Sequence, residues 1–468
     1  MTQTYDAIVI GGGAAGEVAA GRLADGGLSV ALVEELLVGG QCSYWACMPA
    51  KALLRPGHVL AEVARVPGAR EAVTGSLDPD AVFAWRDELA AHWEDDAQVA
   101  WLDDHGVDLV RGHGRLRGEC TVEVDTSDGP RTLRAERAVV LATGSRAVHP
   151  PIDGIDDVEV WDNRDVTTTH DVSERLLIVG AGAVGVESAQ AWRRIGCEEV
   201  VLVEQADAIL PGEESFAAEE LERSLVADGV RVLTGTTVDA FEPGSDGEIV
   251  AHLRHERLVT DRVLLATGRR PDTERLGLSS VGLEDGAPID VDDHQRSSRH
   301  PDWLYAVGDV DGRQLFTHMG KYEARIAADH ILGGPASTSA GRRAIPRIVF
   351  TDPIVAGIGL TEAEARDRYE SVRTVRASIG SQAQAALWGE DLDGTASIVI
   401  DDDRRVIVGA TLTGPPAAAE LAHGVQVAIV GEVPLDLLAH VVPQFPTFAE
   451  VWLDLLAQVE GRSGPAGG

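Results

Sequence analysis

The chain has 468 residues, which is too long for one hydrophobic core and predicts roughly two to four domains. Its formal net charge of −36 disfavours nucleic acid and anionic lipid as partners. No apolar run reaches the roughly 18 residues that a membrane helix needs. The first six residues lead directly into a short apolar run without a secretory signal, so we expect a cytoplasmic protein.

Strand and helix patterns near the N-terminus predict a strand, a glycine turn, a helix and a second strand, at 7–10, 11–16, 17–24 and 28–33. The same order returns at 176–203, so the chain holds two βαβ units. The interval between them is far too long for a solenoid repeat. The pattern instead indicates two separate nucleotide-binding units.

Later segments are less regular. Asp78 and Pro79 can form the N-cap and the first position of a helix that we expect to run from 78 to about 102. Other expected elements are a helix at 213–228, strands ending in turns at 139–144, 263–268 and 304–309, a linker at 334–340, a region of alternating strands and helices without a phosphate loop, and a disordered tail at 461–468.

The first glycine turn has the G-x-G-x-x-G spacing of a dinucleotide site, with Gly11, Gly13 and Gly16 directly after a strand. The first glycine allows the tight turn, the second lets a pyrophosphate approach the backbone, and the third lets helix and strand pack closely. The helix start then offers unpaired N–H groups to the phosphates. Glu34 ends the second strand, where a carboxylate accepts hydrogen bonds from ribose hydroxyls.

The second glycine turn repeats this arrangement with Gly180, Gly182 and Gly185, and Glu204 ends the following strand. One such motif is weak evidence, but two with the correct strand, helix and acid are strong. A carboxylate at Glu204 repels the 2′-phosphate of NADP, and no arginine or lysine follows it within 205–210. We therefore predict that NADH is preferred over NADPH.

Two of the four cysteines, Cys42 and Cys47, lie five residues apart near a predicted helix start. Sulfurs at that spacing can form a reducible disulfide, and a helix N-terminus lowers the pKa of a thiol. Cys120 and Cys197 are isolated, and we expect them to be structural.

The segment from Gly39 to Lys51, GGQCSYWACMPAK, resembles the signature G-G-T-C-x-N-x-G-C-x-P-S-K of the pyridine nucleotide-disulfide oxidoreductases, a family that includes dihydrolipoyl dehydrogenase, glutathione reductase and mercuric reductase. It matches at Gly39, Gly40, Cys42, Cys47, Pro49 and Lys51, and it differs at Gln41, Tyr44, Ala46 and Ala50. The resemblance covers nearly the whole chain and includes Thr143-Gly144, the run 266–273, Gly308-Asp309 and the run 349–362.

The resemblance implies an α/β fold of the glutathione-reductase type, with two Rossmann-like domains and a C-terminal α/β dimerisation domain. The FAD domain would be split over 1–150 and 272–335, the NAD domain would cover 151–271, and the dimerisation domain 336–468. The residues implied for FAD are Gly11, Gly13, Gly16, Glu34, Gly40, Gln41, Lys51, Thr143, Gly144, Gly308 and Asp309. Those implied for NAD are Gly180, Gly182, Gly185, Glu187, Glu204 and Gly268. No metal site is expected.

Catalytic roles also follow from the resemblance. It assigns Cys47 to the flavin side and Cys42 to exchange with substrate. It further implies that Lys51, one of only two lysines, and Glu187 form an ion pair beside the flavin and the nicotinamide. Such a pair is plausible on physical grounds because an unpaired buried charge is costly.

The C-terminal segment departs from the family. The disulfide reductases carry H-x-H-P-T-x-x-E, in which the second histidine is the acid–base and the glutamate orients it. Here Pro446, Thr447 and Glu450 remain, but Phe445 takes the histidine position, and His423 and His440 read as surface or packing residues. Loss of a positioned acid–base costs about 10²–10⁴-fold, so exchange with glutathione or lipoamide should be poor. A substrate of low thiol pKa would need no general acid.

Other branches of the family are also constrained. No cysteine follows Cys197, which disfavours the mercuric reductases and the high-molecular-weight thioredoxin reductases. Trp45 and Phe445 resemble the soluble transhydrogenases, although those typically lose the cysteine at the position of Cys47.

We therefore expect a homodimeric, NADH-dependent FAD enzyme that passes electrons through Cys42 and Cys47 to a disulfide-type acceptor, either a small molecule or a small protein. One alternative is flavin-level transfer to a quinone, a dye or a second nucleotide, with the cysteines secondary. Another is a redox sensor that holds FAD and NAD without useful turnover.

Overall fold

The computed structural model describes residues 2–461, and the tail predicted at 461–468 lies outside them except for Gly461. The chain divides into two compact units. The first comprises the chain up to Pro49, Trp85–Val148 and Gly268–Ser339, and the second comprises Ala50–Ala84, His149–Thr267 and the chain from Ala340 onwards. The division into three domains made from the sequence stays a prediction. Within residues 2–461 no helix combines the length and apolar character needed to cross a membrane.

A largely parallel sheet forms the centre of the first unit, in the order β3-β2-β1-β6-β5-β4, with β17 beside β6. Its parallel strands are β1 (Gln3–Ile10), β2 (Val30–Glu34), β3 (Val107–Arg111), the second half of β6 (Gly129–Leu141) and β17 (Leu304–Ala306). The first half of β6 pairs antiparallel with β5 (Thr121–Thr126), which pairs with β4 (His113–Leu116). The run 7–10 of β1 is buried throughout, as expected for a strand covered on both faces.

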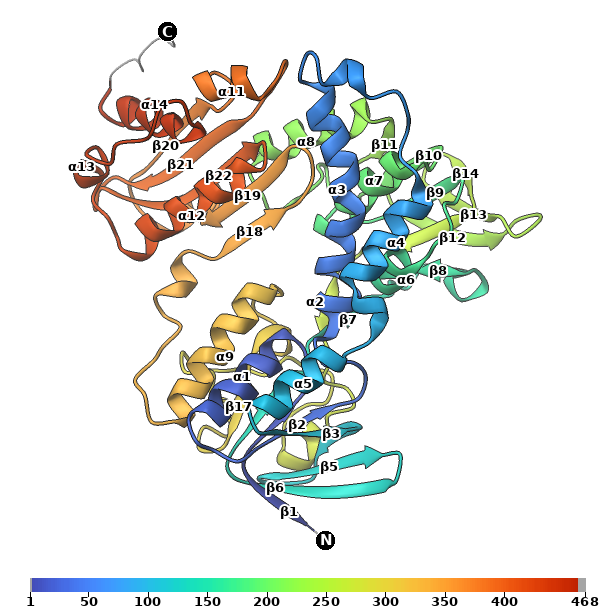
Figure 1. Ribbon diagram of the computed structural model, residues 1–468, viewed down its shortest axis with the longest axis vertical. Coiled ribbons are helices and arrows are strands. Elements are labelled where there is room, and N and C mark those ends of the chain that lie inside the picture. The colour runs from blue at the N-terminus through green and yellow to red at the C-terminus, as the bar shows by residue number, and fades with distance from the viewer. Residues whose placement is uncertain (1, 462–468) are drawn as a thin grey trace. The chain divides into compact units, whose positions relative to one another are not determined.

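Helices α1 (Ala14–Asp25), α5 (Asp96–Asp104) and α9 (Thr317–Ile331) cover one face of this sheet (Figure 1). Ala19 and Ala20 of α1 and Ala324 and Ala327 of α9 are buried in the core between the helices and the sheet. Their small side chains allow α1 and α9 to pack closely. The other face packs against the β4–β6 meander. Short elements complete the unit: α2 (Gly40–Tyr44), η2 (Ala91–Trp93), β7 (Ser145–Ala147), β16 (Arg269–Pro271), η4 (Leu278–Val281) and η5 (Gly308–Asp311).

The second unit contains another parallel sheet, in the order β11-β10-β9-β15-β8. Its strands are β8 (Val160–Trp161), β9 (Arg175–Val179), β10 (Glu199–Val203), β11 (Val230–Leu233) and β15 (Arg262–Leu265). One core joins it to α3 (Cys47–Ala64), α4 (Pro79–Leu89), α6 (Asn163–Thr168), α7 (Ala183–Ile195) and α8 (Ser215–Ala227). The other face packs against the antiparallel strands β12 (Val238–Pro243), β13 (Ile249–Leu253) and β14 (Arg257–Thr260). The two predicted βαβ units and the α/β fold class are thus confirmed.

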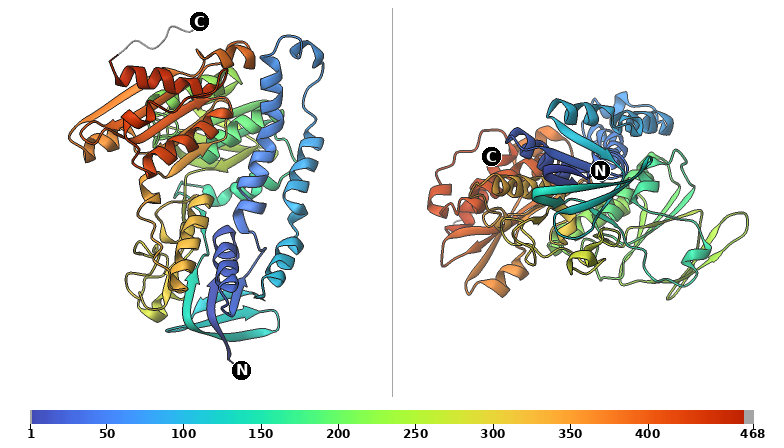
Figure 2. Two further views of the ribbon diagram at one scale, coloured as in Figure 1. Left: turned by 60° about the vertical axis from the view of Figure 1, so that its left-hand side comes forward. Right: turned by 90° about the horizontal axis from the view of Figure 1, so that it is seen from below.

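A five-stranded antiparallel sheet follows in the same unit, in the order β18-β19-β22-β21-β20 (Figure 2). Its strands are β18 (Pro346–Val349), β19 (Ile354–Gly359), β20 (Val372–Ser378), β21 (Thr395–Asp401) and β22 (Val406–Gly414). Helices α12 (Ala417–Val430) and α14 (Val451–Val459) cover one face, and α10 (Glu362–Arg368) packs on the other. The remaining elements are η1 (Arg70–Ala72), η3 (Ile155–Asp157), η6 (Gly341–Arg343), α11 (Ala383–Trp388), α13 (Leu435–Leu438) and η7 (Phe448–Glu450).

The prediction of a single helix over 78–102 was wrong, because α4 ends at Leu89 and α5 begins at Asp96. Between them Ala91, His92 and Trp93 have left-handed φ angles of 48°, 51° and 57°. Tertiary contacts hold this break: the Trp93 indole donates a hydrogen bond to the Tyr44 carbonyl at 3.0 Å. Local propensity is a weak determinant when such contacts compete with it.

The close packing at Gly185, the third glycine of the second turn, can be tested by its effect on stability. A Cβ on Gly185 would lie 1.9 Å from the Gly180 carbonyl oxygen, whereas a Cβ on Gly182 would meet nothing within 4 Å. Gly185→Ala should therefore lower the free energy of unfolding by about 1–3 kcal/mol, as overpacking does. Gly182→Ala, the matched control, should unfold at the wild-type temperature. Thermal unfolding without added nucleotide measures both, and equal midpoints for the two variants would contradict this packing.

Candidate active site

The first glycine turn begins α1 and has one open side. A Cβ on Gly16 would lie 1.8 Å from the Gly11 carbonyl oxygen, so this position requires glycine. A Cβ on Gly13 would have only Gly40 within 4 Å, at 3.9 Å. Gly13 is the N-cap of α1 and supplies no side-chain cap. The N–H groups of the first turn are thus available to an anion.

Glu34, at the end of β2, is held by two backbone N–H groups. Its carboxylate accepts hydrogen bonds from Gly12 and Leu36, each at 2.6 Å. Burial raises the pKa of Glu34, and these two hydrogen bonds oppose the rise. The carboxylate is therefore fixed beside the turn, where the sequence analysis expects a ribose.

Gly39 and Gly40 pack directly on the first glycine turn. The Gly39 N–H donates a hydrogen bond to the Gly12 carbonyl at 2.8 Å. Gly40 has a left-handed φ of 60°, and a Cβ there would lie 2.7 Å from the Gly13 Cα. This backbone contact joins the turn to α2, which begins at Gly40 and carries Gln41 and Cys42.

The structure holds Cys42 and Cys47 as thiols and brings them into hydrogen-bond contact. Cys42 lies in α2, and Cys47 is the first residue of α3. The Thr317 hydroxyl lies 3.4 Å from the Cys47 sulfur. The sulfurs can thus exchange with each other, as the spacing of the pair predicted.

The pKa of the Cys42 thiol lies above its usual range, and the expected effect of a helix start does not dominate. The hydrogen bond with Cys47 is the main cause, followed by burial and by the charge of Cys47. Thr317 and Lys321 oppose this rise. Two coupled thiols lose their protons in successive steps, and the second step is the harder one.

Asp309 is a buried carboxylate in η5, and burial raises its pKa. It accepts a hydrogen bond from the Ser145 hydroxyl, which in turn accepts one from Arg269 at 2.9 Å. The neighbouring Gly308 N–H donates to Glu323 at 2.8 Å. Gly308 and Asp309 therefore lie in a polar network within the first unit.

Thr143 and Gly144 lie directly after β6. The Thr143 hydroxyl donates to the Asp272 carbonyl at 2.8 Å. Gly144 has a left-handed φ of 73°, and a Cβ there would meet nothing within 4 Å. A dinucleotide such as FAD fits three features of this region. They are the uncapped start of α1, the open glycine faces at Gly13 and Gly144, and the fixed carboxylate of Glu34.

The second glycine turn has the same construction. Gly182 is the N-cap of α7 without a side-chain cap. The buried Glu204 carboxylate accepts hydrogen bonds from Ala181 at 2.7 Å and Ala206 at 2.9 Å. Arg194, on the helix that follows the turn, forms ion pairs with Asp228 and Asp352. These features fit a nicotinamide dinucleotide.

Lys51 and Glu187 form the predicted ion pair, with 2.7 Å between Nζ and Oε2. The Glu187 side chain is 7% exposed. Its second oxygen accepts the Phe350 N–H at 2.8 Å, and the Phe350 ring centroid lies 4.9 Å from Nζ. The contacts satisfy both oxygens of the buried carboxylate. Gly268 belongs to the first unit and the other residues implied for NAD to the second, so its role stays a prediction.

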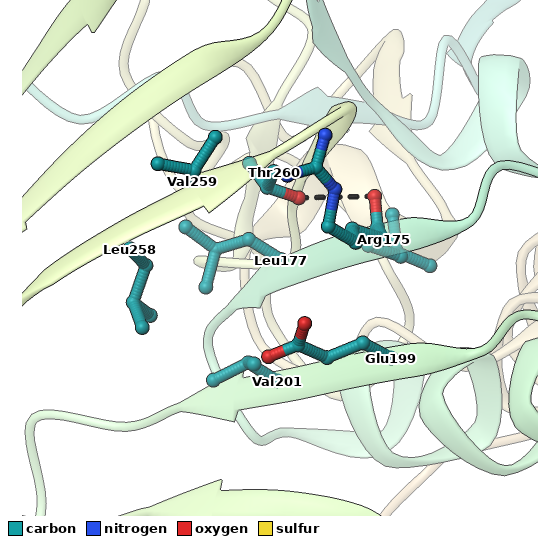
Figure 3. A pocket seen from close by; sticks show the side chains of 8 residues that line it. Arg175, Leu177, Glu199, Val201, Leu258, Val259 and Thr260 are labelled. Atoms are coloured by element: carbon teal, nitrogen blue, oxygen red, sulfur yellow. Dashed lines mark hydrogen bonds between the residues drawn. The ribbon is translucent and has the colours of Figure 1, made fainter.

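A small cavity lies at the opposite end of the same parallel sheet from the second glycine turn (Figure 3). Residues of β9, β10 and β14 line it, including Arg175, Glu199 and Thr260. Its volume of about 10 Å³ is enough for roughly one water molecule. This cavity is too small for a nucleotide.

The C-terminal residues considered for acid–base chemistry differ from one another in their exposure to solvent. Phe445 is 77% exposed, and His423 and His440 are also exposed. Among the described residues, Glu450 Oε2 is a buried oxygen without a hydrogen-bond partner. Within residues 2–461, no group of three or more histidine, cysteine or acidic side chains is arranged to hold a metal.

The isolated cysteines lie in different environments from the pair. Burial raises the pKa of Cys197 to about 11 and also raises that of Cys120. The pKa of Cys42 is raised as well, but mainly by its hydrogen bond with Cys47, whereas burial is the first cause for Cys120 and Cys197. These environments support the structural role expected for both.

Four residues with contacts at these sites escaped the sequence analysis: Glu17, Thr317, Lys321 and Phe350. Glu17 directly follows the first glycine turn and Phe350 lies in the run 349–362, but neither pattern gives these positions a role, and Thr317 and Lys321 lie in a segment without a recognised motif. Lys321 had one available signal, since it is the second of only two lysines in the chain.

Comparison with known proteins supports the same reading over nearly the full length. The family model for pyridine nucleotide-disulphide oxidoreductases matches residues 5–328. The model for the dimerisation domain of that family matches residues 345–456.

Individual relatives agree. The chain is 32% identical to dihydrolipoyl dehydrogenase 3 of Pseudomonas aeruginosa, over 99% of each chain. It is 30% identical to the dihydrolipoyl dehydrogenase of Haloferax volcanii, over 97% of this chain and 96% of the relative. The fold is similar to that of the HOCl-induced flavoprotein disulfide reductase RclA from Escherichia coli, solved as its Cu(II) complex, with a TM-score of 0.86, 25% identity and coverage of 98% and 100%. The chain therefore belongs to the pyridine nucleotide-disulphide oxidoreductases, a family of enzymes that use FAD and NAD(P)H.

Proposed function

We propose that this enzyme takes electrons from NADH and passes them through FAD and the Cys42–Cys47 pair to a disulfide-type acceptor. The contact between the two sulfurs carries this proposal, because Cys42 lies in α2, whose first residue, Gly40, packs on the first glycine turn. A thiol pair so placed can receive electrons from a nucleotide bound at that turn and deliver them to a second disulfide.

The residues of the first unit would hold FAD. The start of α1 would bind the pyrophosphate, Glu34 the ribose, and Asp309 the ribityl chain, as the family resemblance implies. When bound, FAD supplies the two-electron chemistry that links the nicotinamide to the disulfide. Cys47 and Lys51 lie one turn apart on α3, and therefore on the same face of that helix.

Cys42 would exchange with the acceptor, and Cys47 would close the disulfide with it. Attack of the Cys42 sulfur on the acceptor breaks the acceptor's S–S bond and releases a thiolate. Attack of Cys47 on Cys42 then releases the second thiolate and restores the disulfide. Two electrons leave the pair in one cycle.

The enzyme would act as a homodimer. The match to the dimerisation-domain model supports this assembly. So does the cluster of exposed apolar side chains near the C-terminus, where Val441, Val442 and Phe445 are 63%, 83% and 77% exposed. Such a cluster marks an interaction surface.

A second candidate is flavin-level transfer to a quinone, a dye or another nucleotide. Phe445 favours it, since phenylalanine cannot carry the proton that an ordinary thiol leaving group needs. The two candidates differ in their dependence on the cysteines.

Replacing either cysteine separates these candidates. Cys42→Ser and Cys47→Ser should each reduce NADH-dependent turnover of disulfides by at least about a hundredfold, because the pair acts as a unit. Steady-state assays with small disulfides, lipoamide, quinones and thio-NAD measure the effect, and dye reduction is the control that should persist. Unchanged turnover of the preferred acceptor in both variants would eliminate the disulfide route.

Glu204 should determine the choice of nicotinamide nucleotide. The wild-type enzyme should show a higher kcat/KM for NADH than for NADPH, because like charges repel. Glu204→Gln keeps the side-chain shape and removes the charge, so the NADH:NADPH ratio should fall by about tenfold. Thermal unfolding checks that the variant is intact. Equal or better efficiency of the wild type with NADPH would rule out this role.

Phe445→His should restore an acid–base group at the position where the family has one. Glu450 has a buried oxygen able to accept a hydrogen bond from that imidazole. Turnover of lipoamide or glutathione disulfide should rise by about tenfold or more, with a new ionisation near the histidine pKa of about 6.5. Phe445→Leu is the matched control. The expectation fails if the histidine and leucine variants turn over these disulfides equally.

A further inference from the structure

A lysine lies one helical turn beyond the residue that contacts the cysteine pair. Thr317, the first residue of α9, contacts the Cys47 sulfur and also hydrogen-bonds Cys42. Lys321 is four residues further along α9, and residues at that spacing share a helix face. Lys321 therefore lies on the side of α9 that faces the two sulfurs, and its side chain is exposed.

Close packing of α9 against α1 brings an acid to the same place. A Cβ on Gly320 would lie 3.2 Å from the Gly308 Cα and 3.3 Å from the Ala15 Cβ. The two helices therefore meet at Gly320 and Ala15, and they run side by side in Figure 1. Lys321 is the residue after Gly320 in α9, and Glu17 lies two residues after Ala15 in α1.

The charges of this cluster act on one another. Burial raises the pKa of Glu17 to about 7, the charge of Lys321 opposes the rise, and the charge of Glu34 adds to it. Lys321 also lowers the pKa of Cys42, against the hydrogen bond from Cys47 and burial. The charge of one ammonium group thus acts on both a carboxyl group and the thiol assigned to exchange.

We propose that Lys321 is the charge partner of the Cys42 thiolate and that Glu17 moderates it. This inference rests on the disulfide route proposed above. In that route negative charge starts on Cys42, moves to the leaving sulfur as the acceptor's S–S bond breaks and the Cys42–acceptor bond forms, and is quenched by a proton from solvent. A cation beside Cys42 stabilises the attacking thiolate at the start of that step.

Alkylation of one thiol tests this without any acceptor. In the Cys47→Ser holoenzyme, iodoacetamide modification of Cys42 is followed against pH by peptide mass spectrometry, which separates it from Cys120 and Cys197. Adding Lys321→Gln should raise the midpoint by about one pH unit and slow alkylation at pH 7 by about tenfold. Lys321→Arg should restore the midpoint, because it restores the charge.

Two further variants make the result specific. Arg325→Gln removes another exposed cation of α9, one turn beyond Lys321, and should leave the midpoint unchanged. Glu17→Gln should lower the midpoint, because it frees the charge of Lys321. If Lys321→Gln loses its flavin on purification, Glu17→Gln still decides the question.

An unchanged midpoint in Lys321→Gln, or in Glu17→Gln where the first variant is not obtained, overturns the inference. Its failure is distinguishable from failure of the proposed function. A shifted midpoint with no disulfide turnover would leave the charge partner in place and reject the disulfide acceptor. An unshifted midpoint with cysteine-dependent turnover would do the reverse.

Discussion

The close approach of two glycine backbones, Gly13 and Gly40, is the contact on which the first unit's chemistry depends. A single methyl group on Gly40 would lie 2.7 Å from the Gly13 Cα. Because both positions lack a side chain, the segment that carries Cys42 can rest on the turn that begins α1. The nucleotide turn and the segment that carries Cys42 are thereby in direct backbone contact.

Buried and partly buried charges in both units are held by specific partners. Glu34 and Glu204 are fixed by backbone N–H groups, and Glu187 is fixed by Lys51 and by the Phe350 N–H. Paired burial of this kind avoids the cost of an isolated charge. The first two carboxylates lie beside the two glycine turns, and the third holds Lys51 in an ion pair. The same physical rule therefore supports nucleotide binding and the placement of the ion pair.

Local patterns carried most of what the sequence could predict. The glycine turns, the acids Glu34 and Glu204, and the ion pair of Lys51 with Glu187 were all found, because each follows from short spacing or from the family signature. The break between α4 and α5 was missed, since Trp93 is held by a carbonyl almost fifty residues away in the chain, that of Tyr44. Glu17 and Lys321 were missed for the same reason: the charge of Lys321 acts on Glu17 only because α1 packs on α9. Roles of individual site residues remain predictions until variants are measured.

The most direct test of the electron relay counts the electrons that the enzyme accepts. Oxidised holoenzyme is titrated anaerobically with dithionite, and Cys42→Ser is titrated in parallel. A flavin and a disulfide each take two electrons, so the relay predicts four per chain in the wild type and two in the variant. Two electrons per chain in both proteins would show that the cysteine pair takes no part, and would contradict the account.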